Sequence, residues 1–156
     1  MKIIDNFLEL DFFNHIQDLL IYEANYKYSQ TSVDENGNTF FIASLNVKDP
    51  TLNFIAKKIL PHTDFKEFEG CYTNMQFNGM DGDWHVDPGT KTALVMISPT
   101  LSKGSGQFEI KTDKINKIDF VANRLIIFDA KKKHRGRAPK EINTPRVTLA
   151  FKSFEK

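Results

Sequence analysis

The sequence predicts a mainly β protein, a double-stranded β-helix (jelly roll) with two N-terminal helices packed outside one sheet. Helical periodicity is confined to the N-terminal part, about residues 1–65. From about residue 70 to residue 154, short apolar or alternating runs follow one another between turn residues. This pattern is typical of a double-sheet roll, because alternating β and α units would need helical runs between the strands.

The composition suits a single domain spanning residues 1–156, with enough chain to bury one core. Hydrophobic residues make up 40% and include 14 Phe, which fits an aromatic-rich β protein. The formal net charge is +1, so the whole molecule should not attract nucleic acid or membranes strongly. The single cysteine, Cys71, excludes an intramolecular disulfide framework.

The N-terminal segment carries acidic residues within its apolar stretch, and it is therefore not expected to be a signal peptide. No apolar run approaches the roughly 18 residues that a membrane span needs. We therefore expect a cytoplasmic protein without a membrane partner, in a reducing compartment.

The first helix is expected to begin with Asp11 as its cap. The apolar residues that follow have helical spacing and predict about three turns with one buried face: Phe12, Ile16, Leu19 and Leu20. After this helix, Asn36-Gly37 predicts a hairpin turn, and a strand should follow near residues 39–47.

The second helix is expected to start at Asp49-Pro50, which supplies a cap and a proline at the first helical position. Its apolar face consists of Leu52, Ile55 and Ile59. It should stop before Pro61, because the residue before a proline disfavours helical geometry.

The jelly-roll core is predicted to contain strands near residues 70–78, 83–87, 92–98, 106–111, 117–121, 124–129 and 145–154. The run 124–129 is apolar and should be buried. The last run alternates, with Val147, Leu149 and Phe151 on one face and Arg146, Thr148, Ala150 and Lys152 on the other. The stretch 130–139 contains Gly136 and Pro139 and is expected to be a loop.

His85 and Asp87 are two residues apart, so in an extended strand both side chains would reach the same side, with Val86 facing the opposite layer. A short motif of this kind also arises by chance, and the turn-like residues before it leave a surface loop as the alternative. His134 is a third candidate ligand, or else a solvated histidine in a basic loop. Two His and one carboxylate on one face of an iron leave open positions, as in non-haem Fe(II) oxygenases.

Arg146 opens the last strand on its polar, inner face. A buried charge needs a partner of opposite sign, which a dicarboxylate cosubstrate would supply in a bidentate fork. The alternative is an arginine on an edge strand in solvent.

The chain resembles the 2-oxoglutarate/Fe(II)-dependent dioxygenase superfamily over roughly residues 70–154, and prolyl-4-hydroxylase-like members in particular. The order His-x-Asp, distant His, then Arg carries the resemblance, together with the segments GQFEI and RLIIFDAKKKHRGRAP and the N-terminal IIDNFL. The resemblance implies that His85, Asp87 and His134 bind Fe(II). It also implies that Arg146 pairs with the far carboxylate of 2-oxoglutarate and that O2 is the third reactant.

Cosubstrate contacts are also expected from the strand near residues 70–78. Members of the superfamily often carry a tyrosine there, and here Tyr72, Asn74 and Gln76 share one face. Asn74 and Gln76 resemble an Asn/Tyr pair of the nucleic-acid demethylase branch. Together with Thr148, they are the candidate cosubstrate-binding residues beside Arg146.

Other polar residues are interpreted more simply. His15 and His62 lack ligand-spaced partners and are expected to be structural or solvated. Trp84 either packs in the core or stacks on a substrate, and Asp129 is expected to end its strand and not to replace Asp87. The basic residues around His134 form either a solvated face or a rim that steers an anion: Lys131, Lys132, Lys133, Arg135, Arg137 and Lys140.

These features predict a 2-oxoglutarate- and Fe(II)-dependent dioxygenase that hydroxylates an amino-acid or peptidyl residue and releases succinate and CO2. Its substrate would be a small molecule or a peptide. A nucleic-acid demethylase is less favoured, because no aromatic residues are interleaved among the basic ones. Two further alternatives are a cupin-type metal-binding module without redox chemistry and a degenerate oxygenase kept as an interaction module. A cupin would not need a buried arginine in the last strand.

Overall fold

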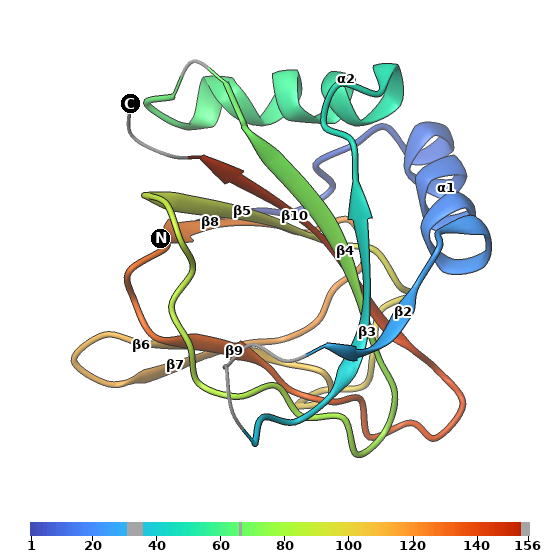
Figure 1. Ribbon diagram of the computed structural model, residues 1–156, viewed down its shortest axis with the longest axis vertical. Helices are drawn as coiled ribbons and strands as arrows, with labels where there is room; N and C mark the ends of the chain where they lie inside the picture. The colour runs from blue at the N-terminus through green and yellow to red at the C-terminus, as the bar shows by residue number, and fades with distance from the viewer. Residues whose placement is uncertain (31–35, 66, 154–156) are drawn as a thin grey trace.

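The computed structural model describes residues 1–30, 36–65 and 67–153 and contains two antiparallel sheets (Figure 1). The larger sheet has the order β1-β8-β5-β10-β4-β3-β2. Its strands are β1 (Lys2–Ile4), β8 (Leu125–Asp129), β5 (Lys91–Met96), β10 (Arg146–Ser153), β4 (Gly70–Gln76), β3 (Phe40–Leu45) and β2 (Lys27–Gln30). The smaller sheet has the order β7 (Ile115–Ile118), β6 (Phe108–Lys111) and β9 (His134–Gly136). The predicted jelly roll is therefore confirmed.

Two helices cover the outer face of the larger sheet, as predicted: α1 (Leu10–Asp18) and α2 (Pro50–Ile59) (Figure 1). In α2 the Asp49 carboxylate accepts hydrogen bonds from the N–H groups of Thr51 and Leu52 at 2.9 and 3.3 Å, which confirms the expected cap. A short 3-10 turn, Leu60–His62, follows its end. No helix in the described ranges is long and apolar enough to cross a membrane.

The start of α1 differs from the prediction. Its cap position is Glu9, and Asp11 lies inside the first turn. A carboxylate there is still favourable, because the unpaired N–H groups give the helix N-terminus partial positive charge. At its other end α1 continues into a π-helical turn, Leu19–Glu23.

The alternation along β10 divides the core into two parts. Val147, Leu149 and Phe151 are fully buried against the helices, together with residues of β5 and β8. The opposite face of β10 meets the second hydrophobic cluster, which lies between the sheets and includes Phe108 and Phe128. The period of two in the sequence therefore placed the apolar and the polar face of β10 correctly.

Four segments differ from the sequence-based prediction. β1 was not expected, and the strand before the predicted hairpin turn was not located, because three or four residues carry too little pattern to be distinguished from coil. β9 lies in the predicted loop, and its extended form depends on pairing with β6. The predicted strand 83–87 is only a single antiparallel bridge between His85 and His134.

The predicted hairpin after α1 is confirmed by strand pairing. β2 and β3 are antiparallel, and Lys27 lies opposite Ile42. Asn36 has a φ of 51°, the left-handed conformation that favours Asn and Gly. The tip was expected at Asn36-Gly37, and residues 31–35, which complete the connection from β2, lie outside the described residues.

Candidate metal and cosubstrate site

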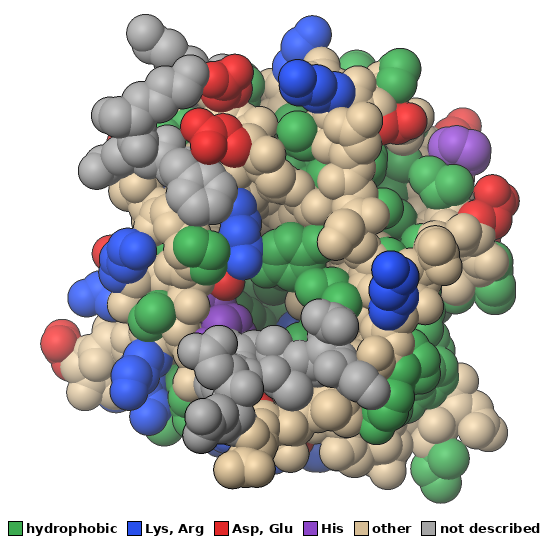
Figure 2. Space-filling model, in the orientation of Figure 1, with side chains coloured by type: hydrophobic (Ala, Val, Ile, Leu, Met, Phe, Trp, Pro, Cys, Tyr) green, Lys and Arg blue, Asp and Glu red, His purple; other side chains and the backbone are tan. Residues whose placement is uncertain are grey.

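A cavity of about 400 Å³ opens between the two sheets, and it contains the predicted site residues. Figure 2 shows the hollow near the centre of this face, with hydrophobic side chains inside it and a histidine, an acidic and a basic side chain beside it. Its volume is in the range of pockets that bind small molecules, roughly 300–1,000 Å³.

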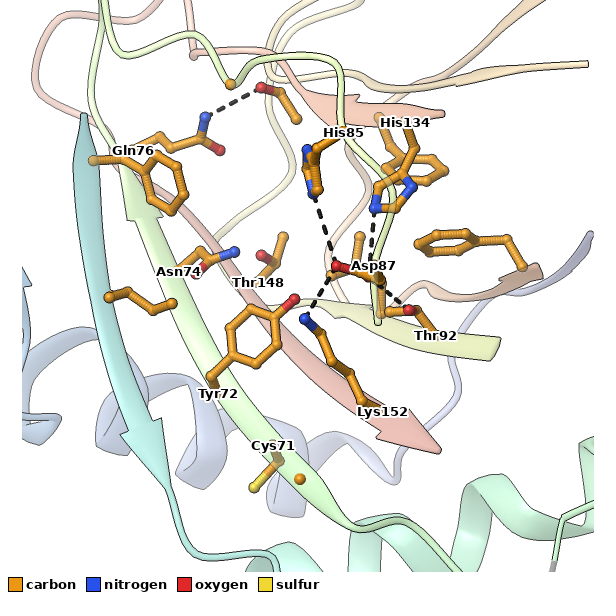
Figure 3. A pocket seen from close by; sticks show the side chains of 18 of the residues that line it. Cys71, Tyr72, Asn74, Gln76, His85, Asp87, Thr92, His134, Thr148 and Lys152 are labelled. Carbon is orange, nitrogen blue, oxygen red and sulfur yellow. Dashed lines mark hydrogen bonds and ion pairs between the residues drawn. The ribbon is translucent and has the colours of Figure 1, made fainter. Parts of the chain in front are cut away.

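His85, Asp87 and His134 each offer one ligand atom, and these atoms lie within 4.8 Å of one another (Figure 3). Backbone hydrogen bonds bring the two segments together. The N–H of His85 donates to the carbonyl of His134 at 3.1 Å, and the N–H of His134 donates back at 2.9 Å. The N–H of Asp87 donates to the carbonyl of Ala130 at 2.9 Å. The bridge thus replaces the predicted strand, and the side chains of His85 and Asp87 still reach the same cavity.

Both imidazoles are oriented for metal binding. Nδ1 of His85 lies 2.8 Å from the carbonyl oxygen of Asp83, and Nδ1 of His134 lies 2.8 Å from that of Lys132. A carbonyl oxygen only accepts, so Nδ1 must be the donor in each case. Nε2 of each ring is the atom left for a metal, and it faces Asp87, at 3.8 Å from His85 and 3.4 Å from His134. Outer hydrogen bonds of this kind fix the tautomer of metal-binding histidines.

The Asp87 carboxylate is buried and held in its charged form. Burial acts to raise its pKa, but hydrogen bonding and charge from His134, with Lys152 and Thr92, lower the pKa well below its ordinary value. The Thr92 hydroxyl donates to Asp87 Oδ2 at 2.6 Å. Burial lowers the pKa of His85. Both shifts favour the protonation states that a divalent cation needs in its ligands.

Arg146 is 2% exposed and has no carboxylate partner among the described residues. Its Nε donates to the carbonyl of Gly106 at 2.8 Å, and Nη1 donates to Oε1 of Gln76 at 2.8 Å. Nη2 is buried without a partner. Burial lowers the pKa of the guanidinium to about 10. A buried cation with a free donor is a ready site for a carboxylate.

Glycines make room for this guanidinium. A Cβ at Gly136 would lie 2.7 Å from Nη1 of Arg146 and 2.8 Å from Cζ. Gly106, whose carbonyl accepts from Arg146, has a φ of 59° that disfavours other residues. In the sequence Gly136 is only a loop signal, because its contact with β10 exists only in the folded sheet.

The three other predicted cosubstrate residues lie on β4 and β10 beside the ligand triad (Figure 3). Gln76 is already engaged, since its amide nitrogen donates to the carbonyls of Met80 and Gly136 while its oxygen holds Arg146. It positions the arginine and has little capacity left for a ligand. Asn74 lies opposite Thr148 across the β4–β10 pair, and its buried Oδ1 has no partner.

Three further residues of the site were not in the predicted set: Tyr72, Thr92 and Lys152. Lys152 Nζ lies 3.1 Å from Asp87 Oδ1 and 4.6 Å from the centre of the Tyr72 ring. Burial raises the pKa of Tyr72 well above its ordinary value, with the charge of Asp87 adding to the effect. Face alternation was the available signal, since Lys152 shares a face with Arg146, and Tyr72 shares one with Asn74.

The remaining candidates lie outside the cavity. His15 is exposed, and His62 contacts Lys2 at 3.2 Å. Trp84 does not line the cavity, and its ring lies 4.3 Å from Lys111 Nζ and 4.5 Å from the Arg135 guanidinium.

The expected orientation of Val86 is wrong, because this residue is 47% exposed at the cavity and does not face the opposite layer. Asp129 is exposed and ends β8, as predicted.

The basic segment around His134 is partly neutralised. Arg135 Nε lies 2.8 Å from Glu109, and Arg137 Nε lies 2.9 Å from Asp81. The three lysines, Lys131, Lys132 and Lys133, are exposed. The predicted basic rim is therefore weaker than the residue types alone suggest.

Solved structures of 2-oxoglutarate-Fe(II) oxygenases match this fold. No protein-family model matches the chain, and no curated protein sequence matches it. A 2-oxoglutarate-Fe(II) oxygenase family protein from Burkholderia pseudomallei matches with a TM-score of 0.73 at 11% identity, covering 96% of this chain and 82% of that one.

Two prolyl hydroxylases are similarly close. A prolyl-4-hydroxylase from Pseudomonas putida has a TM-score of 0.73 at 12% identity, covering 99% of this chain and 92% of that one. A prolyl hydroxylase from Trichoplax adhaerens, in complex with a hypoxia inducible factor peptide fragment, has a TM-score of 0.71 at 18% identity and covers 97% and 83%. At these identities the likeness establishes the fold, and the activity has to be argued from the site.

Proposed function

We propose that this protein is a 2-oxoglutarate- and Fe(II)-dependent dioxygenase that hydroxylates an amino-acid or peptidyl residue. The observation that carries the proposal is the pairing of two features in one cavity. A set of three metal-ligand atoms and a buried arginine without a counter-anion both line it. The first suits Fe(II) with open coordination positions, and the second suits a dicarboxylate.

Each residue then has a role that its geometry supports. His85 and His134 would bind Fe(II) through Nε2, and Asp87 through a carboxylate oxygen, while Thr92 keeps that carboxylate oriented. Nη2 of Arg146 would bind the far carboxylate of 2-oxoglutarate. When bound, the iron and 2-oxoglutarate supply the oxidation: O2, 2-oxoglutarate and a substrate C–H bond give an alcohol, succinate and CO2.

Asn74 and Thr148 would contact the cosubstrate, since both line the cavity together with Arg146 and the metal ligands. The cavity wall that remains for a substrate is largely apolar: Phe40, Ile42, Leu94, Phe108 and Phe128. Such a wall excludes water and fits an aliphatic group. The prolyl hydroxylases among the structural neighbours favour an amino-acid or peptidyl substrate for this site.

The two main alternatives fit the site less well. A cupin-type module would leave Arg146 as an unpaired buried charge, which is costly. A nucleic-acid demethylase would use basic side chains at the cavity mouth, but Arg135 and Arg137 are already ion-paired.

An anaerobic titration tests the proposal. Adding 2-oxoglutarate to the Fe(II)-loaded protein should produce the weak visible charge-transfer absorption of a chelated keto acid. His134→Ala should abolish both this band and succinate formation in air, whereas Lys131→Gln, an exposed control, should keep both. Full metal occupancy and turnover in His134→Ala would show that the ligand assignment is wrong.

A further inference from the structure

The cavity contains a second cation, Lys152, which the cosubstrate does not require. Arg146 and Lys152 lie near opposite ends of β10 with their side chains on the same face. Figure 3 shows Lys152 directed toward Asp87, beside Tyr72. Its side chain is 18% exposed, whereas Arg146 is 2% exposed. The two cations therefore serve different parts of the cavity, and Lys152 lies closer to solvent.

The charges of the site do not balance without a further anion. Asp87, Arg146 and Lys152 are the Asp, Glu, Lys and Arg residues among the described lining residues. Fe(II) and 2-oxoglutarate carry equal and opposite charges, and Asp87 offsets only one of the two cations. One positive charge is left over. It belongs to Lys152, because the far carboxylate of the cosubstrate would neutralise Arg146.

Metal binding raises the free-energy cost of this unpaired positive charge. Without a metal, Lys152 Nζ is paired with Asp87 at 3.1 Å. Once Asp87 binds a divalent cation, its negative charge is shared, and the ammonium then faces a dication within a few ångströms. Charges interact strongly in such a partly buried site, where the effective dielectric constant is far below that of water. A second carboxylate beside Lys152 would relieve the repulsion.

The space next to Lys152 suits a small acid with an apolar body. The face of the Tyr72 ring lies against the ammonium. Ile42, Val86 and Pro88 line the same cavity, and Val86 is 47% exposed at its open side. A ligand that enters there would meet an apolar cavity wall with its body and would present its carboxylate to Nζ.

We propose that Lys152 binds the carboxylate of the primary substrate, and that this substrate is a small monocarboxylic acid of net charge −1, such as an N-acylated amino acid. An internal residue of a peptide chain has amide groups at that place and would leave Lys152 unpaired. Lys152 is then the residue that selects the free acid. The inference rests on the proposed function, since it takes the metal and 2-oxoglutarate as bound.

Binding measurements on the Mn(II)-loaded protein test this without turnover. The first arm measures Mn(II) and 2-oxoglutarate affinity by calorimetry, and failure of either in the wild type would remove the proposed function itself. The second arm compares N-acetyl-L-proline, N-acetyl-L-leucine, N-acetyl-L-phenylalanine and benzoate with their amides in the presence of 2-oxoglutarate. At least one acid should bind about tenfold more tightly than its amide, as a charge-assisted hydrogen bond implies.

Substitutions assign the preference to one side chain. Lys152→Gln should remove the preference for the acid over its amide by lowering the affinity for the acid about tenfold. The affinities for the amide and for 2-oxoglutarate should stay within about twofold of the wild-type values. Lys152→Arg and the exposed control Lys131→Gln should keep the preference. Lys152→Met provides a second neutral variant if Lys152→Gln folds poorly.

Three results would overturn the inference in a protein that binds 2-oxoglutarate. One is that no acid is preferred over its amide in the wild type. Another is that the preference survives in both neutral variants. The third is that the neutral Lys152 variants lose affinity for 2-oxoglutarate and for the acid in parallel, which would make Lys152 a cosubstrate contact.

Discussion

Arg146 combines burial, an unused donor and a lack of any carboxylate partner in the described chain. Lysine would keep the charge but lose the planar fork that Gln76 and Gly106 hold in place. We expect Arg146→Lys to weaken 2-oxoglutarate binding by about 1.5–3 kcal/mol, the range for hydrogen bonds to charged groups. Mn(II) affinity should change far less, because Arg146 is not among the ligand atoms. Calorimetry measures both, and unchanged 2-oxoglutarate affinity in Arg146→Ala would favour the cupin alternative.

His85 links the site to the pH dependence of stability. Burial lowers its pKa in the folded chain, so the unfolded chain binds the proton more readily. Its contribution is present above the ordinary histidine value of about 6.5 and is lost as the pH falls from there toward the folded pKa.

Urea unfolding of the metal-free protein should therefore give a smaller free energy of unfolding at pH 5 than at pH 7. His85→Gln should reduce this difference, whereas His15→Gln, at an exposed position, should not. If the free energy of unfolding fell equally between pH 7 and pH 5 in wild type and in His85→Gln, another group would control this pH dependence.

At the scale of elements, β9 shows how a three-residue strand can shape a binding site. It supplies His134 to the ligand triad and Gly136 to the surface that Arg146 packs against. The two residues are two positions apart and so face the same side of the strand, toward the cavity, and pairing with β6 fixes both. Nothing in a segment of lysines, arginines and one glycine predicts that arrangement.

Gly136→Ala tests the role of β9. The added methyl group would lie within 3 Å of the Arg146 guanidinium, which must then move away from its present contacts. We expect 2-oxoglutarate affinity to fall about tenfold or more, the equivalent of one charged hydrogen bond. The comparison is Gly70→Ala on β4, where the methyl group would meet nothing within 4 Å. Similar 2-oxoglutarate affinity in the two variants would contradict the packing argument.

At the scale of the whole molecule, the site connects the two sheets. β10 and β4 of the larger sheet carry Arg146 and Asn74, while His134 belongs to the smaller sheet. Ligands that bridge these elements bind only the folded state, so they should stabilise it by mass action.

In the presence of Mn(II), 2-oxoglutarate at 100 times its Kd should raise the free energy of unfolding by about 2.7 kcal/mol. Arg146→Ala should lose this increment at the same ligand concentration, because its Kd is higher. Urea unfolding with and without 2-oxoglutarate measures the difference. A full increment in Arg146→Ala would place the binding site elsewhere.

The sequence by itself determined the jelly roll, the helix that begins after Asp49, the alternation of β10 and the proximity of His85, Asp87 and His134. Periodicity, a helix cap and the resemblance of ordered motifs are local or linear signals, so one chain is enough to show them. Tertiary structure alone decided that residues 85–87 form a bridge and not a strand, and that β9 is extended. It also decided that Gln76 holds Arg146 and that Lys152 reaches Asp87. Those facts depend on which distant backbone segments pair in the folded chain and on which charges are left without a partner there. Local sequence predicts neither.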